Sequence, residues 1–152
     1  MNSKELFVRD TTVKKQSDNL FTAEVSENWS IGNTANGGYS MTLAAKAMSE
    51  YLEHKDPLSI SAHYLDRVDF GTTELHVTHL SSSKSLSTAR VELIQDNKIK
   101  IIFIGTFTDF SFKNDMNIYE RDVPNFPEYN SCEVIPYKEG FNPKLDKNIE
   151  KA

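Results

Sequence analysis

Apolar residues recur at helical spacing in one stretch of the chain, about residues 36–53. The residues on the apolar side of this stretch are Met41, Ala44, Ala45, Met48, Tyr51 and Leu52. This spacing predicts a long amphipathic helix, the only one that the pattern indicates. Asn36 is placed to cap the first turn, and Gly37 and Gly38 would then present bare backbone N–H groups at the positive end of the helix dipole. Cations and a proline predict the end of the helix at His54, Lys55 and Pro57.

Alternation of apolar and polar residues predicts one strand before the helix and four after it. The predicted strands are residues 20–25, 58–68, 72–81, 85–95 and 99–110. Asp96 and Asn97, between the last two strands, predict a tight hairpin turn. The last segment is almost continuously apolar, so we expect a central strand that is covered on both faces. A helix followed by a run of antiparallel strands predicts an α+β fold.

Composition divides the chain into three segments. Residues 1–19 form a polar N-terminal segment with a short apolar patch at residues 6–8. Residues 20–110 hold the predicted helix and strands and form the domain. Residues 111–152 form a proline-containing tail or linker remnant, with prolines at Pro124, Pro127, Pro136 and Pro143. Proline fixes φ and removes a backbone donor, so we expect neither a long helix nor a central strand in this tail.

Charge and cysteine content exclude several classes of function. The formal net charge of −5 over 152 residues argues against a nucleic-acid backbone as the main partner. The single cysteine, Cys132, allows no internal disulfide and suits a reducing compartment.

His76 and His79 are three apart on a predicted strand and would point to opposite faces, so we expect no metal site. Residues 1–10 are too polar for a secretory signal and no stretch reaches the length of a membrane span, so we expect a single-domain cytoplasmic protein.

Three local strings occur in a fixed order along the domain. They are Trp29–Gly32 with Asn36–Tyr39, then Ser59–Leu65, then Lys84–Asp96. Together they resemble the thioesterase-like superfamily, the relatives of bacterial acyl-CoA thioesterase II, over roughly residues 20–110. The resemblance implies a hotdog fold, in which an antiparallel sheet wraps around one central helix. It also implies an acyl-CoA thioester as the substrate, so that coenzyme A is part of the substrate and no separate cofactor is expected.

The sequence departs from that superfamily in two places. Family members usually carry two hotdog repeats, and this chain resembles only the first. The second repeat of those relatives supplies the Asp, Thr and Gln that order the attacking water. In addition, the usual Arg-Pro after the Leu of the post-helix strand is replaced here by Asp66-Arg67 after Leu65. Two hypotheses follow: an acyl-CoA hydrolase acting at an interface between two hotdog domains, or a non-catalytic acyl-binding or structural half that needs a partner.

We expect at least a homodimer for either hypothesis. A sheet wrapped around one helix leaves unpaired edges and an apolar back face, which favour association. The expected arrangement joins two sheets edge to edge, so that the pair imitates a double-hotdog chain.

Thioester hydrolysis needs a held water, a group that activates it and donors for the oxyanion. The N–H groups of Gly37 and Gly38 suit a carbonyl oxygen or a phosphate at a helix start. The alternative is that the glycine pair only permits a tight turn and close packing. Gln95 ends a strand in line with an apolar face and matches in kind the Gln of the family strand, which makes it a catalytic candidate. The alternative for Gln95 is a strand end that faces solvent.

Four further residues complete the predicted site. His63 is the remaining candidate base, although a buried or edge histidine without catalytic work is the commoner case. Arg90 could bind a phosphate of the substrate, or lie as a solvated arginine on the sheet surface. Asn36 and Tyr39 are expected to line the substrate pocket beside the glycines, with Tyr39 also serving as a packing anchor. The first two turns of the helix hold no carboxylate, which argues against catalysis by the chain alone.

Overall fold

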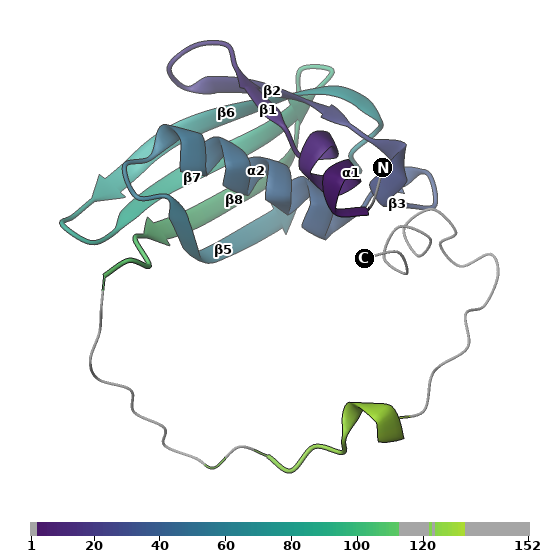
Figure 1. Cartoon of the computed structure of the whole chain (residues 1–152). Coiled ribbons are helices and arrows are strands. Elements are labelled where there is room, and N and C mark those ends of the chain that lie inside the picture. Colours follow the sequence, from purple (N-terminus) through teal and green to yellow (C-terminus); the bar gives the residue numbers. More distant parts are fainter. Residues whose placement is uncertain (1–2, 113–121, 123, 133–152) are drawn as a thin grey trace.

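Six antiparallel strands form one sheet in the order β1-β2-β6-β7-β8-β5 (Figure 1). The computed structural model describes residues 3–112, 122 and 124–132. The strands are β1 (Val13–Lys15), β2 (Leu20–Val25), β5 (Asp56–Tyr64), β6 (Gly71–Ser82), β7 (Ser87–Gln95) and β8 (Lys98–Thr108). All five predicted strands are present, and β1 is an additional one that pairs with β2. The φ angles of Asp96 and Asn97, 51° and 57°, confirm the predicted tight turn between β7 and β8.

The predicted helix, α2 (Gly37–Tyr51), lies across one face of this sheet, as Figure 1 shows. At its start the side-chain Oδ1 of Asn36 accepts the N–H of Gly38 at 2.8 Å and that of Tyr39 at 3.3 Å. At its end the Lys55 ammonium donates to two carbonyl oxygens at 2.8 and 2.6 Å. Both ends are therefore capped where the sequence predicted, and the α+β prediction is confirmed.

The buried face of α2 is rotated from the predicted one. The buried residues are Tyr39, Ser40, Leu43, Ala44, Ala47 and Met48. The helix is apolar around most of its circumference, so spacing alone could not select the face that packs on the sheet. Gly105 on β8 allows a close approach there, because a Cβ at this position would lie 2.5 Å from the Met48 sulfur. The core between helix and sheet includes Phe21, Leu75, Val91, Leu93 and Phe103.

The first 35 residues hold short elements that the pattern did not predict. They are α1 (Ser3–Asp10), the 3-10 helix η1 (Glu27–Trp29) and a small hairpin of β3 (Ser30–Ile31) and β4 (Thr34–Ala35). Phe7 of α1 meets the Trp29 ring edge to face, with centroids 4.9 Å apart. A helix of one or two turns has little stability of its own, so tertiary contacts of this kind decide whether it forms.

β8 is an interior strand of the sheet, between β7 and β5, but it is covered by the described residues on only one face. Phe103 and Phe107 are fully buried on the face toward α2. Ile104 points to the opposite face and is 39% exposed. The expectation that this strand is covered on both faces is therefore wrong within the described part of the chain.

The predicted proline-containing tail, residues 111–152, falls mostly outside the described residues. Within it the structure describes one short 3-10 helix, η2 (Tyr129–Ser131). The irregular character expected of the tail therefore stays a prediction. Among the helices that the structure describes, none is long and apolar enough to cross a membrane.

Candidate active site

A cavity of about 310 Å³ lies at the N-terminal end of α2. Its walls come from β4, from the first residue of α2, from the last residue of β5 and the segment that follows it, and from β8. The carbonyl oxygen of Val68 ties two of these walls together, because it accepts the backbone N–H of Ala35 at 3.0 Å and the hydroxyl of Thr34 at 2.9 Å. The cavity is therefore framed by segments that are fixed to one another.

Gly37 and Tyr64 meet at the wall formed by the helix start. A Cβ at Gly37 would lie 2.9 Å from the Tyr64 hydroxyl oxygen and 3.0 Å from two ring carbons, so a larger residue here would displace the tyrosine ring. The N–H of Gly37 donates to no other described residue. The N–H of Gly38 is not bare, contrary to expectation, because Asn36 accepts it. The cavity is thus lined by Gly37, whose N–H has no partner among the described residues, and by Tyr64 with its phenol hydroxyl.

Two ion pairs lie along the segment after β5. The Asp66 carboxylate is 2.9 Å from the buried Lys100 ammonium, and the guanidinium of Arg67 is 3.3 Å from the Asp69 carboxylate. The hydrogen bond from Lys100, followed by that from the Arg67 N–H, holds the pKa of Asp66 below its ordinary value. Asp66 is therefore ionised at neutral pH, and it is the one carboxylate among the residues that line this cavity.

Gln95 holds the far end of the same segment. Its Oε1 accepts the backbone N–H of Asp69 at 2.9 Å, and its Nε2 donates to the carbonyl oxygen of Asp69 at 2.9 Å. The side chain is buried, with 8% of the residue exposed, and it does not line the cavity at Gly37. Gln95 is thus a tether for the cavity segment, and its catalytic role stays a prediction.

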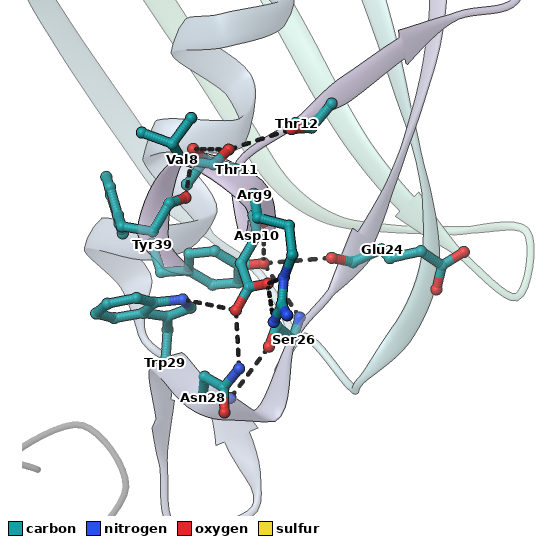
Figure 2. A network of polar contacts seen from close by, with 11 residues as sticks. Val8, Arg9, Asp10, Thr11, Thr12, Glu24, Ser26, Asn28, Trp29 and Tyr39 are labelled. Atoms are coloured by element: carbon teal, nitrogen blue, oxygen red, sulfur yellow. Dashed lines mark hydrogen bonds and ion pairs between the residues drawn. The ribbon is translucent and has the colours of Figure 1, made fainter. Parts of the chain in front are cut away.

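Tyr39 does not line the cavity either, because its hydroxyl is buried in a polar network around Asp10 (Figure 2). This hydroxyl donates to the Asp10 carbonyl at 2.7 Å and accepts the N–H of Ser26 at 3.1 Å. The Asp10 carboxylate accepts from the side chains of Asn28 at 2.9 Å and Trp29 at 3.2 Å. Burial raises the pKa of Asp10, but hydrogen bonds, first that of Asn28, outweigh burial and lower it overall. Tyr39 therefore anchors α2 to the N-terminal segment.

The outer face of the sheet carries the remaining two predicted site residues. His63 is paired with Ile102 and Arg90 with Ile104, and both isoleucines point away from α2. His63 is exposed, and Arg90 forms an ion pair with Glu92 at 3.1 Å. Neither His63 nor Arg90 reaches the cavity at the helix start. Among the described residues, no group of three or more His, Cys, Asp or Glu side chains could hold a metal ion.

Of the predicted site residues, Gly37 alone lines this cavity, which adds residues that sequence reasoning missed. Asn36 caps the helix start as expected, but neither Asn36 nor Gly38 is among the lining residues. Tyr64 and Asp66 were missed as site residues, although the Asp66-Arg67 departure from the family pattern marked this segment. Tyr64 could not be distinguished from an ordinary strand residue, because only the fold places its hydroxyl against Gly37.

Comparison with protein families gives one match, to the acyl-CoA thioesterase N-terminal domain, over residues 25–109 of the chain. The comparison with curated proteins found no match.

Solved structures resemble the chain over most of its length. A protein assigned as thioesterase II from Thermobifida fusca is 21% identical, with a TM-score of 0.79. The match covers 95% of this chain and 53% of the Thermobifida chain. A hot dog fold protein from Alicyclobacillus acidocaldarius is 14% identical, with a TM-score of 0.78, and the match covers 93% of this chain and 52% of that protein. The tesB protein of Mycobacterium avium subsp. paratuberculosis is 20% identical, with a TM-score of 0.71, and the match covers 86% of this chain and 50% of that protein. The predicted single hotdog fold is confirmed, and the chain spans about half the length of these proteins.

Proposed function

This chain belongs to the family of acyl-CoA thioesterase N-terminal domains, and we propose that it binds an acyl-CoA thioester and hydrolyses it. Coenzyme A enters as part of the substrate, and the proposal needs no other cofactor. A reducing, cytoplasmic location belongs to the proposal because the sequence has a single cysteine.

The pair of donors at the start of α2 is the observation that supports this proposal. The free N–H of Gly37 and the hydroxyl of Tyr64 border one cavity. A tetrahedral oxyanion is stabilised by donors that are already in position, and the helix start adds positive potential. We propose that the thioester oxygen binds between these donors, with the acyl chain running along Ala35, Val68 and Ile101.

Assembly of two copies is also part of the proposal. β5 is an edge strand of the sheet. Leu58, Tyr64 and Leu65, on β5 and just after it, are 57%, 54% and 60% exposed. An unpaired edge with exposed apolar side chains favours pairing with another strand. Two copies joined at β5 would continue the sheet and bring the second copy beside the cavity, so that the substrate binds at an interface between hotdog domains.

A second candidate function is a non-catalytic acyl-binding or structural half that works with a partner. The observation that favours it is the length of the match, because the chain spans about half of each compared structure. A partner domain would then supply the groups that activate water.

A thioester-release assay on the full chain separates the two candidates. Short-chain and long-chain acyl-CoA are offered at neutral pH, and free thiol is measured alongside ligand binding by calorimetry. Release of coenzyme A above the uncatalysed rate supports the hydrolase. Saturable binding without release favours the non-catalytic half, and neither binding nor release contradicts both.

A further inference from the structure

Hydrolysis of a thioester in the cavity beside Gly37 needs a group that takes a proton from water. The identity of that group is an inference that rests on the proposed function. The first two turns of α2 contain no Asp or Glu. His63, the base expected from the sequence, lies on the outer face of the sheet. Among the residues that line the cavity, Asp66 is the one carboxylate. We propose that Asp66 is the catalytic base of this chain.

Lys100 holds Asp66 in place through backbone and side chain together. The carbonyl oxygen of Lys100 accepts the N–H groups of Leu65 and Asp66 at 2.9 and 3.0 Å. Its ammonium donates to Asp66 Oδ2 at 2.9 Å, while Oδ1 accepts the N–H of Arg67 at 2.8 Å. These contacts orient the carboxylate without using all of its acceptor sites, because a carboxylate offers about four lone pairs. The side chain is 52% exposed, so water can reach the remaining sites.

The reaction at this site balances with water and thioester as the only reactants. The Asp66 carboxylate takes a proton from water as the water oxygen forms a bond to the thioester carbon. The carbonyl electron pair moves to the oxygen, which is held by the Gly37 N–H and the Tyr64 hydroxyl. When the C=O bond reforms, the C–S bond breaks, and the thiolate of coenzyme A receives the proton from Asp66. The products are a carboxylic acid and free coenzyme A.

The ion pair with the Lys100 ammonium allows a test that distinguishes a catalytic Asp66 from a merely structural one. The pKa of Asp66 is lowered, with the Lys100 hydrogen bond as the first cause. A base works when deprotonated, so the rate should fall only in acid well below neutral pH. Removing the ammonium in Lys100→Met raises the pKa of Asp66 toward its ordinary value. The acid limb of the rate–pH profile should therefore move to higher pH in that variant.

The test compares kcat/KM of the full chain and its variants with one acyl-CoA substrate. Asp66→Asn keeps the shape but removes the base and one of the two oxygens that accept from Lys100 and Arg67, and we expect a loss of about 10²- to 10⁴-fold. Asp66→Glu should recover part of this loss. Asp69→Asn is the matched control, since it changes a carboxylate in the same segment that does not line the cavity. Circular dichroism checks that each variant is folded.

Three results would overturn the inference. If the parent hydrolyses acyl-CoA and Asp66→Asn keeps its rate, Asp66 is not the base and the proposed function still stands. If Asp66→Asn is slow but the profile of Lys100→Met does not shift, Asp66 has a structural role only. If the parent itself releases no coenzyme A, the hydrolase proposal fails together with this inference.

Discussion

Replacing Gln95 by Ala removes the tether of the segment that lines the cavity. The Gln95 amide makes two hydrogen bonds to the backbone of Asp69, both at 2.9 Å, and the residue is 8% exposed. Each such bond contributes about 1 kcal/mol net, so the variant should lose about 2 kcal/mol of unfolding free energy. The Asp69 groups left without partners would add to this loss unless water reaches them.

Urea unfolding followed by circular dichroism measures this difference. For a domain of this size the free energy changes by roughly 1–3 kcal/mol per molar urea, so the midpoint should fall by about 1 M. Gln16→Ala is the matched control, because Gln16 is an exposed glutamine whose side chain bonds the Thr22 hydroxyl at 2.8 Å. Its effect should stay within about 0.5 kcal/mol.

The same variant tests the catalytic role expected of Gln95 from the sequence. A glutamine that bonds the transition state would slow turnover by about 10²-fold or more when replaced. A folded Gln95→Ala protein with the parent rate would remove that role. A midpoint equal to that of the parent would instead refute the tether and the energy assigned to it.

Four further predictions concern the donors, the buried carboxylate and the assembly. Tyr64→Phe should lower kcat by about 10²-fold with little change in urea stability, because its hydroxyl bonds no other described residue. Gly37→Ala should lower the rate at least as much while the protein stays folded, since the added Cβ displaces the Tyr64 hydroxyl; a parent-like rate would exclude this donor pair. Because the folded pKa of Asp10 lies below its ordinary value of 3.8, its stabilisation is present above that pH and lost as the pH falls through the folded pKa. Unfolding midpoints between about pH 5 and pH 2 should therefore fall more steeply for the parent than for Asp10→Asn. Light scattering at micromolar concentration should give the mass of a dimer, and a monomer mass would contradict association at β5.

The elements of the domain could be predicted because their causes are local. Alternation predicted residues 20–25 as a strand, and β2 has those bounds. Asn36 predicted the start of α2, because a cap acts on N–H groups two and three residues away. Asp96 and Asn97 predicted the β7–β8 turn, since few residues accept a positive φ. The three family strings extended this local information to the hotdog fold.

The site depended on contacts between residues far apart in sequence, which only the tertiary structure decided. Tyr64 reaches Gly37 because β5 ends beside the start of α2. Gln95 reaches the backbone of Asp69, 26 residues away, because β6 and β7 pair in one particular register. The buried face of α2 was decided in the same way, since a helix whose apolar residues cover a wide arc takes its orientation from the sheet that it packs against. The periodicity of apolar residues indicates which residues are buried, whereas tertiary packing determines which neighbours they contact.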